Sequence, residues 1–259
     1  MKNTIALFII FTVFLQTVIG QKIDNTVAFR DIKSDNYFRF NYDNDFFTAT
    51  DKNYTQGYSL ELVAPCFKAN PLNRLFYTPK DVETRYGLAL EHIGFTPARF
   101  EFPEVQFGDR PFAAAIMLKS FMISTDSTKK NRFTSAFSLG LIGPGAFGKE
   151  MQVAIHTALD NKIPLGWRNQ IKNDLVVNYE IGYEKQLVRY KDLVSLQANA
   201  NAKVGTLFTN VSLGVNTTFG IINSPFSSSV NRNGFTICLC TAHGKCYRLR
   251  CNAARWVIQ

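Results

Sequence analysis

The chain has 259 residues, a formal net charge of +9, and hydrophobic residues at 46% of its positions. This length allows one or two ordinary domains. The positive charge is concentrated at one end, because residues 231–259 hold five Lys and Arg and no acidic residue. The basic balance is therefore no argument for nucleic-acid binding, and we expect no nucleic-acid partner.

The N-terminus has the pattern of a secretory signal peptide. Lys2 precedes the apolar run "TIALFIIFTVFLQTVIG", which ends in small residues before Gln21. A charged start, a short apolar core and a small-residue exit are typical of a cleaved leader. We therefore predict a signal peptide over 1–20, with cleavage after Gly20. An uncleaved membrane anchor is the alternative, but the run is shorter than the about 20 residues that a spanning helix needs.

The rest of the chain contains long segments in which apolar and polar residues alternate. In "NDLVVNYEIGYEKQL", which starts at residue 173, one face carries Leu, Val, Tyr and Ile, and the other carries Asn, Glu and Gly. Alternation with this period indicates a strand that has one apolar and one polar face. Strands are expected near residues 37–48, 56–65, 84–96, 112–125, 132–143, 173–189, 193–205 and 208–222.

The composition of these strands favours a membrane protein. Their polar faces carry Asn, Gln, Lys and Glu, and aromatic residues cluster near their ends. Strands of about ten residues with these features are typical of a transmembrane barrel. We predict an all-β fold, a transmembrane antiparallel β-barrel with lipid-facing apolar and lumen-facing polar residues. A secreted β-sandwich is the alternative, because its strands alternate as well.

One segment interrupts the alternation. The stretch "GPGAFGKEMQVAIHTALDNKIPLGW" opens with Gly and Pro and then places apolar residues at helical spacing, which predicts a helix that ends near 161–166. Gln152 and His156 lie four residues apart, so their side chains share one side of that helix. A lone helix with a Gln and His face between barrel strands suggests a functional role. Trp167, just beyond it, is expected to pack at the barrel rim or in a loop.

A second unusual stretch, "NYDNDFFTATDKNYTQG", covers residues 41–57. A turn explains its Asn, Asp and Gly residues, because these bond their own backbone or tolerate positive φ. A turn does not explain Asp45, which stands among Tyr42, Phe46 and Phe47. The stretch is therefore either a hydrated wall of the lumen or part of a site.

The C-terminal segment "TICLCTAHGKCYRLRCNAARWVIQ" lacks alternation and holds four of the five cysteines. A zinc site with His243 is one reading, but the spacings match no zinc pattern. We favour a reading-frame shift, because one codon choice for "YRLRCNAARWVIQ" encodes the strand-like "IGYDATLQGGLF" in the next frame. The prediction is then a barrel domain over 21–235 that lacks its last strands, followed by a frame-shifted tail over 236–259.

Five motifs, taken together and in order, resemble the outer-membrane lipid A 3′-O-deacylase family. They are "NDFFTATDKNYTQG", "HIGFTP", "GDRPFAA", "GPGAFGKEMQVAIH" and "GWRNQIKND". The resemblance implies a barrel of twelve strands in the outer membrane, with a site among lumenal side chains near the outer leaflet. It also implies an ester hydrolase that removes acyl chains from lipid A with the help of calcium. We expect a membrane-embedded monomer.

The resemblance also assigns roles to residues of this chain. His156 matches the catalytic histidine, which takes a proton from the attacking water, and Gln152 matches its neighbour on the helix. Asn44 and Asp45 match the Asn-Asp pair of the site and are the expected calcium ligands, since an Asp and an amide oxygen suit this ion. Thr55 matches the Thr of the Tyr-Thr-x-Gly motif.

Two positions depart from the family pattern. Lys162 stands where the family places an acidic residue, and Glu150 or Asp160 is a candidate substitute. The basic residue that the family contributes after the "TP" turn has no matched counterpart within residues 99–104. A non-catalytic barrel of the same fold, either a channel or a structural surface protein, is therefore the alternative function.

Overall fold

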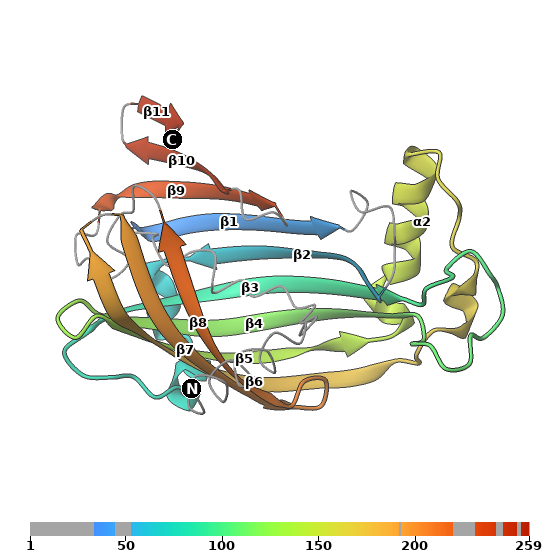
Figure 1. The fold of residues 1–259 in the computed structure, drawn as a ribbon, viewed down its shortest axis with the longest axis horizontal. Helices are drawn as coiled ribbons and strands as arrows, with labels where there is room; N and C mark the ends of the chain where they lie inside the picture. Colours follow the sequence, from blue (N-terminus) through green and yellow to red (C-terminus); the bar gives the residue numbers. More distant parts are fainter. Residues whose placement is uncertain are drawn as a thin grey trace, which may run out of the picture.

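The computed structural model describes residues 34–44, 53–191, 193–219, 231–241, 246–252 and 255–258. Eight consecutive strands form the main part of this described structure (Figure 1). They are β1 (Ser34–Asn44), β2 (Asn53–Val63), β3 (Glu83–Thr96), β4 (Ala113–Asp126), β5 (Asn131–Ile142), β6 (Asp174–Tyr190), β7 (Val194–Gly205) and β8 (Asn210–Phe219). Short 3₁₀ segments η3 (Pro65–Ala69) and η4 (Pro71–Leu75) connect β2 to β3.

The strands and the helix predicted from the sequence are confirmed. Each of the eight predicted strands corresponds to one of β1–β8. The alternation of apolar and polar residues identified them, because successive side chains of a strand point to opposite faces. The first strand was expected to reach residue 48 but ends at Asn44, and residues 45–52 lie outside the described ones. Helix α2 (Gly148–Ala158) occupies the segment predicted as helical, but it ends before the predicted 161–166.

The strands form one sheet in the order β11-β10-β9-β1-β2-β3-β4-β5-β6-β7-β8. Every neighbouring pair from β1 to β8 is antiparallel, as predicted for the fold class. The sheet is not closed, since β8 and β11 stand at its two ends. Figure 1 shows β7 and β8 sloping steeply across the direction of β1–β5.

Three strands follow the meander: β9 (Asn231–Thr241), β10 (Cys246–Asn252) and β11 (Arg255–Ile258). Strand β9 pairs with β1 in parallel, whereas the last strand of an antiparallel meander would approach the first strand from the opposite direction. These strands overlap the predicted tail over 236–259, and the frame shift stays a prediction.

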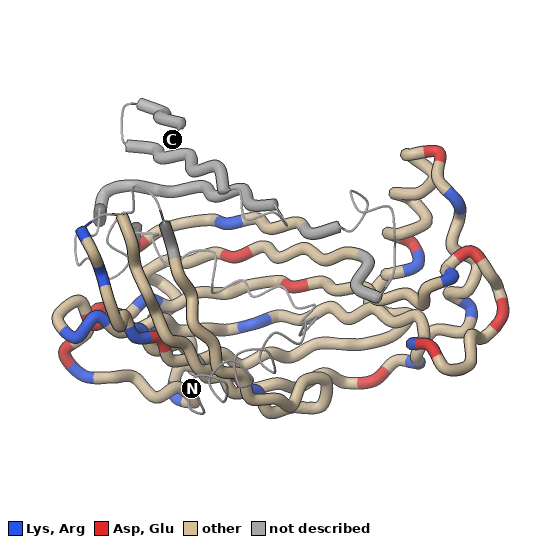
Figure 2. Tube along the Cα trace, viewed as in Figure 1, with Lys and Arg blue, Asp and Glu red and all other residues tan. Residues whose placement is uncertain are grey.

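One face of the sheet carries charged side chains that pair across neighbouring strands. Figure 2 shows basic and acidic positions along the neighbouring strands β1 to β4. Arg39 lies opposite Glu61 in the β1–β2 register, and the two form an ion pair. Within the described strands, further nitrogen–oxygen pairs that join neighbouring strands on this face are Lys119–Glu91 at 2.6 Å, Arg132–Glu184 at 3.0 Å and Lys203–Glu180 at 2.8 Å. None of these side chains is more than 19% exposed. We call these four pairs the charged ladder.

The opposite face of the sheet is apolar. Leu118 precedes Lys119 of the charged ladder, so its side chain points to the other side of β4. It is 55% exposed and lies between Leu90 and Leu139 in the strand register. Other exposed side chains of this apolar face are Leu62, Leu139, Leu175, Ile181, Val204, Val211, Leu213 and Val215.

Two connections at one end of the sheet contain the residues of the candidate site. The first, residues 97–112, joins β3 to β4, and we call it the β3–β4 loop. The second joins β5 to β6 and contains η5 (Pro144–Ala146), α2 and η6 (Gly166–Asn169). Among the described residues, no helix has the length and apolar character required to cross a membrane.

Candidate active site

Helix α2 begins against the apolar face of the sheet. A side chain on Gly148 would meet the Cβ of Ala114 at 2.3 Å, so only glycine allows the helix to start this close to β4. Ala114 shares its face of β4 with Leu118, because the two residues are four apart on one strand. The site was expected among lumenal side chains. The start of this helix packs on the face opposite the charged ladder, and the position of the site stays a prediction.

A histidine of the sheet holds the turn that precedes the helix. His92 is 1% exposed, and its Nε2 lies 2.8 Å from the backbone oxygen of Ala146. Its ring stacks on Tyr58 with a centroid distance of 5.0 Å. The next residue, Phe147, has φ of 59°, which turns the chain from η5 into α2. The start of the helix is thus fixed to β3 and β4 together.

The buried side of α2 is its polar side. Gln152 is 1% exposed and His156 is 5% exposed, whereas Ala154 and Ala158 are exposed. An ordinary surface helix buries its apolar residues instead. Burying two polar side chains costs free energy unless they are hydrogen-bonded. The seam between α2 and the elements that cover its polar side, which we call the helix seam, is therefore the candidate active site.

The histidine of the helix seam has a defined orientation. Its Nδ1 lies 2.5 Å from the backbone oxygen of Lys162, and the ring meets Phe100 edge-on with a centroid distance of 5.4 Å. A carbonyl oxygen only accepts hydrogen bonds, so in the neutral ring Nδ1 carries the proton and Nε2 is the basic nitrogen. The side chain of Asn161 accepts the N–H of Lys162 at 2.8 Å and fixes this turn.

The identity of the side chain at Lys162, where the resemblance implies an acidic residue, does not affect the orienting contact of His156. The acceptor is a main-chain oxygen, which every residue type supplies. Glu150 and Asp160, which were considered as substitutes for the missing acid, are both exposed. Neither is needed to orient the imidazole through Nδ1.

The glutamine of the helix seam is held by a tryptophan. Trp167 is 2% exposed, and its Nε1–H donates to Oε1 of Gln152 at 2.7 Å. The indole also packs against Phe112, with ring centroids 5.0 Å apart. Trp167 was expected to pack in a loop or at the rim, and its burial agrees with a packing role. Its hydrogen bond to Gln152 was not expected.

The β3–β4 loop is attached to the segment that follows α2. The N–H of Leu165 donates to the oxygen of Phe100 at 3.2 Å, and the side chains of Arg168 and Asn169 donate to the oxygen of Pro103 at 3.0 and 2.8 Å. These bonds hold Phe100, whose ring contacts the ring of His156, in the helix seam. The two connections therefore form one structural unit.

The loop is also stabilised from within. The carboxylate of Asp109 accepts the N–H groups of Ala98 and Arg110, each at 2.7 Å. These two hydrogen bonds lower the pKa of Asp109, the bond from Ala98 most strongly. The carboxylate thereby closes the loop between residues 98 and 110 at neutral pH.

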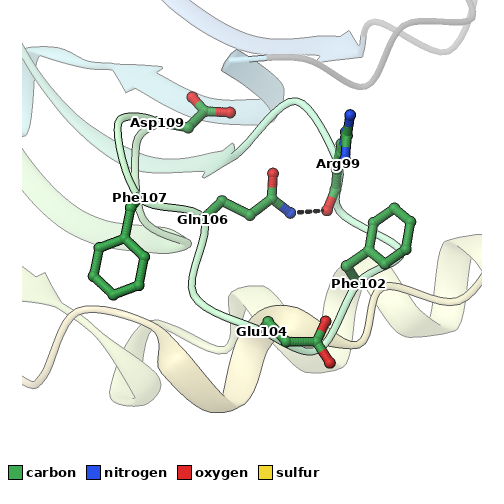
Figure 3. Close-up of a pocket in the computed structure, with 6 residues that line it drawn as sticks. All are labelled: Arg99, Phe102, Glu104, Gln106, Phe107 and Asp109. Atoms are coloured by element: carbon green, nitrogen blue, oxygen red, sulfur yellow. Dashed lines mark hydrogen bonds between the residues drawn. The ribbon is translucent and has the colours of Figure 1, made fainter.

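The loop encloses a shallow cavity of about 420 Å³ (Figure 3). Its lining residues are Arg99, Phe102, Glu104, Gln106, Phe107 and Asp109. The guanidinium of Arg99 lies 5.8 Å from the centroid of the Phe102 ring, and the amide of Gln106 donates to the Arg99 backbone oxygen. Two carboxylates and one guanidinium line this cavity, so it offers no net positive charge to an anionic group.

The remaining predicted site residues lie at the ends of β1 and β2. Asn44 pairs with Gln56 in the strand register, and Thr55 lies at an irregularity in the pairing of β2 with β3. The side chains of Asn44 and Thr55, and all of Asp45, lie outside what the structure describes. Their assembly with His156 and Gln152 therefore stays a prediction.

The metal prediction concerns the same residues. Within the described residues, no group of three or more His, Cys, Asp and Glu side chains could hold a metal ion. The expected calcium ligands, Asn44 and Asp45, are not described as side chains. A carboxylate and an amide oxygen remain a donor set that suits calcium.

The sequence reading missed three participants in the site. His92 supports η5 from the apolar face. Trp167 binds Gln152, and the main chain of Lys162 binds His156. The nearest sequence signal was the motif "GWRNQIKND", which contains Trp167 and follows the helix directly. A backbone acceptor leaves no signal in a sequence.

Comparison with known proteins identifies the family. The model of the family described as "Outer membrane protein LpxR" matches residues 6–252. The chain belongs to the LpxR family. The sequence matches no curated protein.

A solved structure supports the fold assignment. The chain resembles "LpxR from Salmonella typhimurium" with a TM-score of 0.55 and 18% sequence identity. The match covers 80% of this chain and 66% of that one, so the chain spans slightly less than two thirds of the length of the solved relative. At this identity, the likeness concerns the fold.

Membership of an outer-membrane family indicates which face of the sheet meets lipid and which face lines the lumen. In a barrel of that membrane the apolar face meets lipid, and the polar face lines the lumen. The exposed leucines beside β4 are then lipid-facing, and the charged ladder is lumenal. Helix α2 consequently begins on the lipid side of the wall in this LpxR-family protein.

Proposed function

We propose that this LpxR-family protein is an outer-membrane ester hydrolase that removes an acyl chain from lipid A. The observation that carries the proposal is the buried His156 on α2, with Nδ1 bound to the Lys162 oxygen. That bond prepares Nε2 to accept a proton, as a general base requires. Family membership and the order of the sequence motifs support lipid A as the substrate.

The location of the helix seam suits a lipid substrate. Helix α2 begins beside Ala114, on the same face as the lipid-facing Leu118. An acyl ester in the outer leaflet can approach this face from the membrane, without passing through the lumen. The helix and the β3–β4 loop limit access of bulk water, which strengthens electrostatic interactions within the seam.

The proposed reaction is a hydrolysis by activated water. Nε2 of His156 takes one proton from water, and the water oxygen adds to the ester carbonyl carbon. The bond between that carbon and the sugar oxygen then breaks, and the sugar oxygen takes the proton from the imidazolium. The products are a free fatty acid and a sugar hydroxyl, and the histidine returns to its neutral form.

Calcium assistance is part of the proposal. Asp45 and Asn44 are the proposed ligands, and a bound calcium ion would stabilise negative charge on the carbonyl oxygen. The steps assigned to His156 rest on its hydrogen bond to the backbone oxygen of Lys162, which follows α2.

The test is incubation of the purified protein with lipid A in water enriched in ¹⁸O. Mass spectrometry should show lipid A that has lost one acyloxyacyl unit, and a released fatty acid that carries one ¹⁸O in its carboxylate. Unchanged lipid A, at calcium concentrations from zero to millimolar, would favour the non-catalytic barrel. Acyl release without the isotope would contradict the activated-water step.

A further inference from the structure

The amide of Gln152 is only half satisfied. Its Oε1 accepts the indole N–H of Trp167, but its Nε2 is buried and has no hydrogen-bond partner among the described residues. Gln152 is 1% exposed, so bulk water does not compensate this donor. A buried, unsatisfied donor is costly in a folded protein and calls for an explanation.

The hydrogen bond from Trp167 determines which atom of the Gln152 amide lacks a partner. An indole nitrogen can only donate, so the oxygen of Gln152 must face Trp167 and the NH₂ group must point elsewhere. An asparagine or glutamine amide without such a partner could turn over and exchange its two ends. Trp167 therefore removes this ambiguity.

The indole is fixed in its place by packing. It forms a buried cluster with Phe112, Ala114 and Ala146, and it is 2% exposed. A Cβ on Gly148 would approach the indole Cζ3 and Cη2 at 3.2 and 2.8 Å, so the helix start leaves no space for another position. The donor to Gln152 thus cannot move without disrupting the start of α2.

We propose that Trp167 is a positioning residue that orients Gln152 so that its Nε2–H groups donate to the carbonyl oxygen of the ester as negative charge develops there. This inference rests on the proposed function. Gln152 lies one helical turn before His156 on the buried side of α2, so the amide donor and the imidazole base face the same seam. Fixed donors directed at a developing oxyanion are among the largest contributions to ester hydrolysis.

Trp167→Phe and two variants of Gln152 test the inference. Trp167→Phe keeps an aromatic ring but removes the N–H, and should lower kcat by about 10- to 100-fold with little change in KM. Gln152→Ala should lower kcat by about 10²- to 10³-fold. Gln152→Glu keeps an acceptor for the indole but loses both donors, so it should be as inactive as Gln152→Ala.

The decisive control is the double variant. If Trp167 acts through Gln152, then Trp167→Phe should cost nothing further in a Gln152→Ala background. If Trp167 only packs, the two losses add, or kcat per folded molecule is unchanged while the unfolding midpoint falls. Either of these results overturns the inference.

A second measurement does not depend on catalysis. In a Trp256→Phe background Trp167 is the remaining tryptophan, and its indole N–H can be followed by hydrogen exchange in NMR. Gln152→Leu should speed this exchange strongly, and Gln152→Glu should not. Equal exchange in all three proteins overturns the positioning contact. If the wild type releases no fatty acid but the exchange result holds, the proposed function fails and the oxyanion role fails with it, whereas the orienting contact stands.

Discussion

The charged ladder and the helix seam both bury polar side chains, but they leave them in different states. In the ladder each carboxylate faces a cation on a neighbouring strand, for example Glu184 with Arg132 at 3.0 Å. In the helix seam Oε1 of Gln152 accepts the indole N–H of Trp167, and Nδ1 of His156 binds the backbone oxygen of Lys162. The ladder joins side chains of opposite charge, whereas the seam fixes the two side chains to which the proposed reaction assigns roles.

The two regions also lie on opposite faces of the same wall. Lys119 of the ladder and Leu118 of the apolar face are consecutive on β4, and α2 begins on the side of Leu118. A strand separates its two faces by the thickness of the sheet alone. Substitutions in the charged ladder should therefore change the stability of the wall, whereas substitutions in the helix seam should change turnover.

The largest expected effect is on turnover, from loss of the base in the helix seam. His156→Ala should reduce ester hydrolysis by about 10²- to 10⁴-fold, because the proton acceptor for water is lost. The variant should still show the heat-dependent gel mobility of a folded barrel. Fatty-acid release measured by mass spectrometry provides the comparison. Undiminished release by the variant would rule out His156 as the base.

The next expected effect comes from removal of calcium. A chelator should suppress turnover and added calcium should restore it, because Asp45 and Asn44 are the proposed ligands. Asp45→Asn should reproduce the effect of the chelator at ordinary calcium concentrations. Turnover that is the same at every chelator concentration would show that calcium has no role, and the steps assigned to His156 would be unaffected.

A substitution in the charged ladder should change stability instead. Arg132→Met leaves the buried Glu184 without this partner and should lower the free energy of unfolding by about 3–5 kcal/mol. Lys129→Met is the matched control. Lys129 pairs with Asp126 at 3.7 Å but is 74% exposed, so its loss should cost less than about 1 kcal/mol. Denaturant unfolding in detergent measures both, and equal costs would contradict the distinction.

The smallest effect is expected at Lys162, the position where the resemblance implies an acidic residue. Lys162→Ala and Lys162→Glu should both keep kcat within about threefold of wild type, because His156 binds the main-chain oxygen. Steady-state kinetics on lipid A provides the measurement. A large gain in Lys162→Glu alone would show that an acidic side chain at this position contributes to catalysis.

The strands and the helix could be predicted because their signals are local. Alternation in β6, for instance, follows from strand geometry and needs no tertiary information. The buried side of α2 could not be predicted from the position of its apolar residues, since Ala154 and Ala158 are exposed while Gln152 is buried. That choice depends on the tertiary contact between the helix and Trp167.

The partners within the site were less predictable still. Trp167 lies 15 residues from Gln152 in the sequence, and only the fold of the β5–β6 connection brings the two within 2.7 Å. Helix α2 lies on this face of the wall because Gly148 packs closely against Ala114. The periodicity of the sequence does not predict this contact. The resemblance assigns roles to His156 and Gln152, which stay predictions, and the structure shows the hydrogen bonds that hold the two side chains.

We infer that the helix seam catalyses the hydrolysis, and that loss of a partner in the charged ladder destabilises the wall. One experiment compares His156→Ala and Arg132→Met in the same detergent, and measures fatty-acid release per folded molecule and the unfolding midpoint of each. We expect His156→Ala to be folded and inactive, with a midpoint near wild type, and Arg132→Met to be destabilised but fully active per folded molecule. Loss of activity in Arg132→Met together with retained activity in His156→Ala would contradict the claim.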